Sequence, residues 1–194
     1  MARVSLVERR RTQTRLEIAK VALELFAKDG YDGVTAETIA EESGVSLRTF
    51  YRYFSGKDEV LSPIMTSATE RLVGRIAERP ADEELHTAVE RAYEQQSSDV
   101  GLAGVSPLIG LLTDVPTLRA RWISDLRVIE DALVPVVRQR ASRSLDDTQV
   151  RLTAAVIVTA FRVTLELSMR QGSEEPRTDE LGRALRYLRD GAAL

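Results

Sequence analysis

The chain has 194 residues, of which 43% are hydrophobic and 29% charged, a composition typical of a folded protein rather than a disordered one. It contains no cysteine and a single histidine, His86, which excludes disulfides, thiolate metal sites and a cysteine nucleophile. The formal net charge is −3, but the first twenty residues hold six bases against two acids, so the N-terminal end is suited to phosphate.

The sequence predicts an all-α fold of about nine helices. Apolar residues recur with a 3.6-residue period, and no alternating run is bounded by a hairpin turn. The first helix is predicted from about Thr14 to Asp29, because Thr14 and Glu17 have the spacing of a capping box and Gly30 would end the helix. The basic segment before Thr14 is expected to form an arm that could add a turn to this helix.

Two very short helices are predicted next, over residues 36–42 and 47–53. Thr35 and Ser46 are placed as their N-caps, and Gly44 lies in the tight connection between them. This arrangement predicts two helices that cross closely.

A fourth, longer helix is predicted to start after Ser55, whose spacing to Asp58 suits a capping box. Pro63 would lie in its second turn and should bend it. The remaining helices are expected near residues 83–97, 100–113, 116–140, 146–171 and 177–190.

The segment from Thr35 to Leu61 has the layout of a helix-turn-helix. Such a unit needs a small residue where the helices cross, and Ala40 supplies it. It also needs a residue that tolerates a left-handed backbone in the turn, and Gly44 follows four positions later. The inward-facing apolar residues would be Ile39, Val45 and Phe50.

The flanking residues extend this pattern. They are Ala22, Leu25, Phe26, Gly30, Tyr31 and Thr35 before the unit, and Tyr51, Tyr53, Phe54, Lys57, Asp58 and Glu59 after it. Together, residues 12–61 resemble the N-terminal domain of the TetR family of one-component repressors. The resemblance implies a DNA-binding domain over residues 1–61, with a basic N-terminal arm, and a helical ligand-binding and dimerisation domain over residues 62–194. Arg48 and Leu47 depart from the family's usual small and polar residues, which puts the DNA sequence that is read in doubt.

The second short helix would be the recognition helix, so its first and outward residues should meet the DNA. Arg48 is the first candidate to read a base, because a guanidinium can bond guanine O6 and N7 together. Thr49 could contact a thymine methyl group, a base or a phosphate. The predicted DNA-contacting residues are Thr35, Ser46, Leu47, Arg48, Thr49, Tyr51, Arg52, Tyr53 and Lys57.

Several of these residues have a second interpretation. Thr35 and Ser46 would cap their helices in any case, and Tyr53 could pack inward. Lys57, like the two caps, would lie at a helix N-terminus that favours phosphate. The arginines at 9–11 are interpreted as a phosphate-seeking arm, with a solvated tail as the alternative.

The family architecture implies that the last two helices pair with their symmetry mates, so the chain is expected to be a homodimer. The eighth helix is apolar around most of its circumference over residues 150–167, and Leu181, Ala184, Leu185 and Leu188 form a stripe on the ninth. A two-fold dimer would present its recognition helices about 34–36 Å apart, one turn of DNA.

A pocket for a small-molecule effector is expected among helices four to eight. The candidate ligand-binding residues are Met65, Leu108, Leu112, Trp122, Leu126, Ile129 and Phe161. Trp122 and Met65 offer polarisable walls suited to an apolar molecule, although each of these residues could equally be core. Arg119, Arg121 and Arg162 could meet an anionic head group, or form surface salt bridges instead.

The expected function is therefore a repressor of double-stranded operator DNA that a small apolar or acyl-type effector releases, with no cofactor and no metal. A helical enzyme is the second hypothesis, but no paired acids form a motif and nothing is arranged around His86. A third is an interaction adaptor with a vestigial helix-turn-helix. The uncharged stretch between Arg151 and Arg162 is too short for a membrane span, so a cytoplasmic protein is expected.

Overall fold

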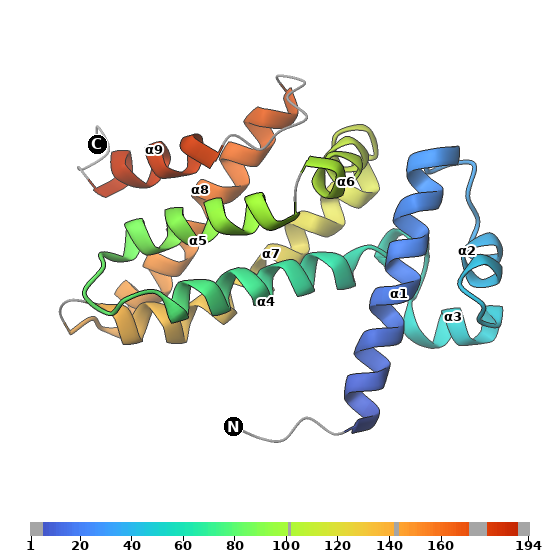
Figure 1. Ribbon diagram of the computed structural model, residues 1–194, viewed down its shortest axis with the longest axis horizontal. Coiled ribbons are helices and arrows are strands. Elements are labelled where there is room, and N and C mark those ends of the chain that lie inside the picture. Colours follow the sequence, from blue (N-terminus) through green and yellow to red (C-terminus); the bar gives the residue numbers. More distant parts are fainter. Residues whose placement is uncertain (1–5, 101, 142–143, 171–177, 190–194) are drawn as a thin grey trace. The chain divides into compact units, whose positions relative to one another are not determined.

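The computed structural model describes residues 6–100, 102–141, 144–170 and 178–189. Within these ranges the chain forms nine α-helices and one short 3₁₀ helix, with no strand, which confirms the predicted all-α class (Figure 1). None of the described helices has the length and apolarity needed to cross a membrane.

The fold divides into two compact units. The first comprises Met1–Ser67 and Leu111–Asp125, and the second comprises Ala68–Gly110 and Leu126–Leu194. The expected domain boundary after residue 61 stays a prediction, and the first unit contains a segment, 111–125, that this boundary would assign elsewhere.

The first unit is built on α1 (Leu6–Asp29), α2 (Ala36–Glu42), α3 (Leu47–Tyr53) and the 3₁₀ helix η1 (Lys57–Glu59). The start of α4 (Ser62–Glu78), the end of α6 (Leu102–Asp114) and the start of α7 (Pro116–Arg140) complete it. Phe26, Phe50 and Phe54 are almost wholly buried in its core. Burial of each ring contributes about 1.5–3 kcal/mol to folding.

The first helix starts earlier than predicted. Thr14 lies inside α1 rather than at its N-cap, and Glu17 accepts a hydrogen bond from the side chain of Gln13 instead. The arginines at positions 9–11 are therefore helical and do not form an extended arm. The physical reason is local, because the segment is rich in good helix formers and Glu8 lies favourably in the first turn.

The start of the fourth helix also differs from the prediction. The backbone and hydroxyl of Ser55 both donate to Glu59 Oε2, at 2.8 and 2.7 Å, so Glu59 rather than Asp58 is the partner of Ser55. Helix α4 begins at Ser62, which places Pro63 in the first turn. A proline there removes no intrahelical hydrogen bond, so the expected bend has no cause.

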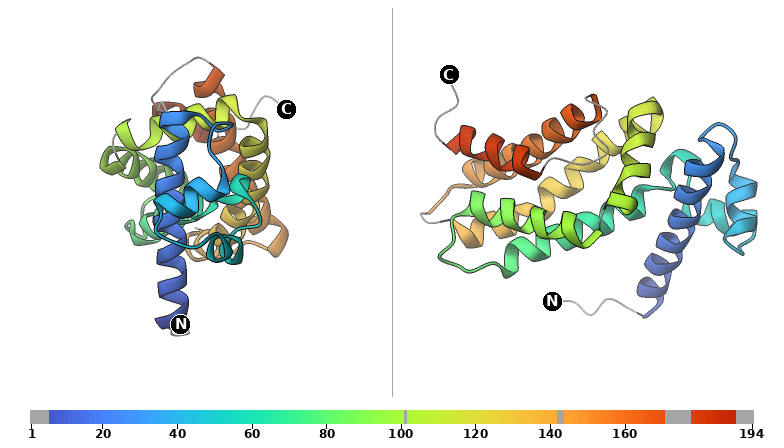
Figure 2. Two further views of the ribbon diagram at one scale, coloured as in Figure 1. Left: turned by 90° about the vertical axis from the view of Figure 1, so that its right-hand side faces the viewer. Right: turned by 45° about the horizontal axis from the view of Figure 1, so that its top comes forward.

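The second unit contains the rest of α4, α6 and α7 together with α5 (Leu85–Val100), α8 (Asp147–Arg170) and α9 (Thr178–Arg189). Helix α9 packs against both α5 and α8 (Figures 1 and 2). The five predicted ranges for helices five to nine agree with these bounds to within three residues.

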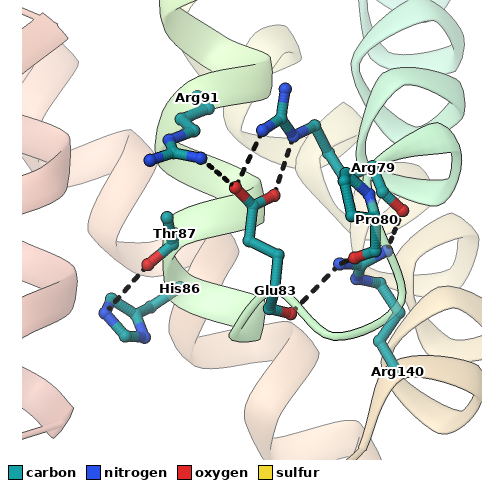
Figure 3. Close-up of polar contacts among 7 residues, drawn as sticks. All are labelled: Arg79, Pro80, Glu83, His86, Thr87, Arg91 and Arg140. Atoms are coloured by element: carbon teal, nitrogen blue, oxygen red, sulfur yellow. Dashed lines mark hydrogen bonds and ion pairs between the residues drawn. The ribbon is translucent and has the colours of Figure 1, made fainter.

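The connection between α4 and α5 is held by arginines (Figure 3). Arg140, the last residue of α7, donates to the backbone oxygens of Arg79, Pro80 and Glu83. The Glu83 carboxylate accepts from Arg79 at 2.7 and 2.8 Å and from Arg91 at 2.5 Å. The hydrogen bonds from Arg79, helped by the charge of Arg91, lower the pKa of Glu83 to about 2.

Part of the apolar stripe on α9, which was expected to pair two chains, is buried within the single chain. Leu181 and Leu185 on α9 are only 1% and 5% exposed in the single chain. Leu188 and its neighbour Tyr187 remain exposed, at 39% and 57%. The outer surface of α9 available to a partner is therefore narrower than the sequence pattern predicts.

Candidate nucleic-acid interface

The turn between α2 and α3 has the expected geometry. Gly44 has a φ of 66°, in the left-handed region that glycine adopts without strain. The amide of Val45 donates to the carbonyl oxygen of Ala40 at 2.9 Å, and Ala40 itself is 1% exposed. The small residue and the glycine thus allow the two short helices to cross closely.

Both predicted N-caps are confirmed. The Thr35 hydroxyl accepts from the amide of Thr38 at 3.2 Å, and the Ser46 hydroxyl accepts from the amide of Thr49 at 3.1 Å. Ser46 Oγ and Thr49 Oγ1 also lie 2.9 Å apart, so these hydroxyls bond each other. A contact of Thr35 or Ser46 with phosphate stays a prediction.

Helix α3 is anchored by one buried ring. Phe50 is fully buried, and its ring lies 5.3 Å from that of Phe54. Arg48 and Arg52 are exposed, and Tyr51 is 52% exposed. The remaining predicted contact residues on this helix, Leu47, Thr49 and Tyr53, are half-buried. Phe50 therefore fixes α3 to the core, and the helix exposes arginine and tyrosine side chains to solvent.

Lys57 has a structural role that the sequence did not indicate. Its ammonium group donates to the backbone oxygens of Tyr31 at 2.8 Å and Val34 at 3.1 Å, and lies 4.1 Å from the centre of the Tyr31 ring. Lys57 thus ties η1 to the connection between α1 and α2. Because an ammonium has three N–H groups, the predicted phosphate contact would have to use the third.

The first turns of α7 contact the helix-turn-helix region through a polar stripe, which we call the α7 stripe, formed by Thr117, Arg121 and Asp125. Thr117 hydrogen-bonds the side chain of Tyr31. Asp125 accepts from the Ser62 hydroxyl at 2.8 Å and pairs with Arg121 at 3.2 Å. The spacing of four residues places the three side chains on one face of the helix.

Glu59 is where the α7 stripe meets η1. Arg121 lies 3.6 Å from Glu59 Oε1, and Arg15 of α1 lies 3.9 Å from the same oxygen. Burial raises the pKa of Glu59, but the hydrogen bonds from Ser55 and the charges of Arg121 and Arg15 outweigh it, so the pKa is lower than usual. One carboxylate thus links α1, η1 and α7.

The predicted ligand-binding residues differ in burial and fall in both units. Leu112, Trp122 and Leu126 are buried, whereas Met65, Leu108, Ile129 and Phe161 are half-buried. The Phe161 ring lies 5.5 Å from that of Tyr93. Trp122 is 2% exposed, and its indole Nε1 has no hydrogen-bond partner in the described part of the chain. Their role in binding a ligand stays a prediction.

The three arginines considered for an anionic head group are all engaged. Arg119 donates to the backbone oxygens of Leu112 and Thr113 at the end of α6. Arg162 makes two hydrogen bonds to the Glu166 carboxylate, at 2.8 and 2.9 Å, and Arg121 pairs with acids as described. The structure therefore favours the alternative, in which these arginines bond groups of the same chain rather than an anionic ligand.

Comparison with known proteins covers both parts of the chain. Residues 18–63 match the family model for bacterial regulatory proteins of the tetR family, and residues 79–193 match the model of the MftR C-terminal domain. The HTH-type transcriptional regulator TcmR of Streptomyces glaucescens is 30% identical over 165 residues, which are 80% of this chain and 73% of TcmR. The HTH-type transcriptional repressor AcnR of Corynebacterium glutamicum is 28% identical over 149 residues, which are 76% and 74% of the two chains.

Solved structures show the same fold. A TetR-family regulator from Syntrophomonas wolfei superposes with a TM-score of 0.65 at 18% identity, covering 94% of this chain and 97% of the other. Thermus thermophilus FadR, a TetR-family repressor in complex with lauroyl-CoA, gives a TM-score of 0.58 at 22% identity, covering 93% and 95%.

Proposed function

Because this chain belongs to the TetR family of bacterial transcriptional regulators, we propose that it is a homodimeric repressor that an apolar or acyl-type effector releases from a palindromic operator. The observation that carries the proposal is the complete helix-turn-helix. Its turn is formed by Gly44, its recognition helix is anchored by Phe50, and Arg48 is exposed in the first turn of that helix.

Arg48 is the residue that we expect to read a base. It lies one residue after the start of α3, the end of a recognition helix that enters the major groove first. A guanidinium there can bond guanine O6 and N7 together, which is worth about 1–3 kcal/mol of discrimination. Tyr51 and Arg52, later on the same helix and exposed, suit contacts to the phosphate backbone.

Exposed apolar side chains on the last two helices support the homodimer. They are Leu152, Val163 and Leu167 on α8, and Tyr187 and Leu188 on α9. Large apolar residues exposed together are typical of a surface that another chain covers. A two-fold axis through these helices would also supply the second recognition helix that a palindrome requires.

The buried indole N–H of Trp122 supports the proposal that the effector carries an oxygen acceptor. A buried N–H without a partner costs about 1–3 kcal/mol, so a bound carbonyl or thioester oxygen near the indole would recover that free energy. FadR of Thermus thermophilus has the same fold and was solved with lauroyl-CoA, which motivates the choice of an acyl compound.

The α7 stripe offers a path from the effector to the DNA. Trp122 directly follows Arg121, which pairs with Glu59, so a ligand that shifts the α7 backbone at Trp122 would also shift Arg121. Glu59 lies in η1, which follows the recognition helix after three residues. We infer that the effector favours a second arrangement of α7 and η1 in which the recognition helices no longer match the operator.

Selection from random duplex DNA on the purified protein tests the proposal. The expected result is a palindrome whose half-sites lie about 10–10.5 base pairs apart, or a multiple of that spacing. Failure to enrich any sequence would favour the adaptor hypothesis. Turnover of a substrate that is unaffected by Arg48→Ala would favour an enzyme.

A further inference from the structure

A basic groove lies where α1 passes the end of the recognition helix. It has a volume of about 480 Å³, and its lining residues are Val7, Arg10, Arg11, Thr14, Arg52 and Tyr53. The four residues from α1 have the spacing of one helix face, and the two from α3 lie in its last turn. We call this feature the α1–α3 groove.

The α1–α3 groove differs from the rest of the described surface in its charge balance. Many arginines elsewhere bond carboxylates, as Arg79 does with Glu83 and Arg186 with Glu90. The groove contains the guanidinium groups of three arginines and no acidic side chain. Among the described residues, none of these three arginines forms an ion pair; Arg52 lies 5.1 Å from the centre of the Tyr53 ring.

Uncompensated guanidinium groups around one concave site favour an anion with several oxygens. Guanidinium forks bond phosphate oxygens in pairs, and the Thr14 hydroxyl adds a further donor. A backbone phosphodiester has two charged non-bridging oxygens, each of which can accept more than one hydrogen bond, so several guanidinium groups around one site can share it.

We propose that the α1–α3 groove binds a phosphodiester of the operator backbone beside the bases that α3 reads. Arg48 and Arg52 are separated by four residues, about 6 Å along the helix, so the base reader and the groove are close enough to contact one DNA segment. The assignment rests on the proposed binding to DNA and adds residues of α1 to the reading surface. Arg10 and Arg11 would position the recognition helix without reading sequence.

The structure supplies matched variants for a test. Arg11→Gln and Arg52→Gln each remove one charge from the groove and leave a polar side chain. Lys28→Gln removes the same charge from an exposed position at the other end of α1, which does not line the groove. Glutamine is a good helix former, and the melting temperature and circular dichroism of each variant show whether the fold is intact.

The measurement is the affinity for the selected operator as a function of salt. Arg11→Gln and Arg52→Gln should each lower the affinity about tenfold for every sequence alike. The slope of log affinity against log salt should become shallower by about 0.9 for each phosphate that the protein no longer neutralises. Their combined effect should be smaller than the product of the single effects, because both act on one phosphate. Lys28→Gln should change affinity by less than about twofold, as a charge screened by solvent does.

Duplexes that carry a single neutral methylphosphonate locate the phosphate that the groove binds. One substituted position per half-site should weaken the unchanged protein about tenfold and weaken Arg11→Gln and Arg52→Gln clearly less. Equal losses for Lys28→Gln and Arg11→Gln would overturn the groove assignment even if the protein still selects an operator. A neutral phosphate that weakens all the proteins alike would overturn it in the same way. If the unchanged protein selects no sequence at all, the proposed function and the groove assignment both fail.

Discussion

The guanidinium group of Arg121 lies 3.6 Å from the Glu59 carboxylate and joins the start of α7 to the helix that follows the recognition helix. The side chains are 39% and 19% exposed, so solvent screens the pair and its contribution to stability is about 1 kcal/mol or less. Its importance would lie in position rather than in stability, because Arg121 precedes Trp122.

Arg121→Gln should therefore change regulation more than folding. We expect a loss of about 1 kcal/mol or less in the free energy of unfolding, measured with urea. The pKa of Glu59, followed by carboxyl NMR, should rise because a stabilising positive charge is removed. The ratio of operator affinities with and without an effector should fall towards one, and a ratio equal to that of the unchanged protein would show that coupling takes another path.

Arg48→Ala tests the reading of a base. The variant should lose about 1–3 kcal/mol on the selected operator and relax the preference at one base pair in each half-site. Repeating the duplex selection on the variant measures both effects. Full affinity with an unchanged preference profile would mean that another residue of α3 reads that position.

Lys57→Met separates two roles of this side chain. The variant should lower the free energy of unfolding by about 1–3 kcal/mol, because two hydrogen bonds from a charged group to backbone oxygens are removed. If the third N–H also bonds phosphate, operator affinity should fall for all sequences and depend less steeply on salt. Normal stability of Lys57→Met would contradict the tie between η1 and the α1–α2 connection.

The two short helices and their turn could be predicted because their signals are local. Thr35, Ser46 and Gly44 each act within a few residues, and the helix bounds follow directly from them. The predicted start of α1 was wrong because Thr14 and Glu17 imitate a capping box inside a segment that continues as helix. A local motif cannot show whether the chain before it is also helical.

The α7 stripe and the α1–α3 groove depend on contacts between distant residues. Arg121 and Glu59 are sixty-two positions apart, and hydrophobic periodicity does not identify polar partners. The one available signal was the spacing of Thr117, Arg121 and Asp125, which marks a polar face beside the apolar stripe of Trp122. Likewise, the periodicity of Leu181 and Leu185 showed a buried face but not that the same chain buries it.

Glu83 should make stability fall in acid. Its folded pKa of about 2 is below the ordinary value of 4.5, so its contribution is complete above pH 4.5 and is lost as the pH falls towards 2. Urea unfolding between pH 7 and pH 3 measures the loss. Glu83→Gln, which cannot titrate, should flatten this part of the profile, and an unchanged pH dependence would show that other carboxylates cause it.

Trp122→Phe distinguishes a sensing residue from a packing residue. Trp122→Ala alone is ambiguous, because removal of a buried aromatic ring costs about 3–5 kcal/mol wherever it lies. Phenylalanine keeps an aromatic ring and removes the buried N–H that has no partner in the described part of the chain. The cost of the smaller ring is thus offset by the removal of an unsatisfied donor worth about 1–3 kcal/mol, and stability should change little.

The two roles then predict different binding. If Nε1 donates to an effector, Trp122→Phe should keep operator affinity but weaken an acyl ligand about tenfold or more, measured by calorimetry with acyl-CoA thioesters of increasing chain length. In the unchanged protein, the same ligand should alter the fluorescence of the only tryptophan and lower operator affinity over one concentration range. Operator DNA should weaken ligand binding by the same factor, because coupling between two sites is reciprocal. A large loss of stability in Trp122→Phe, with any acyl response unchanged, would identify Trp122 as packing alone.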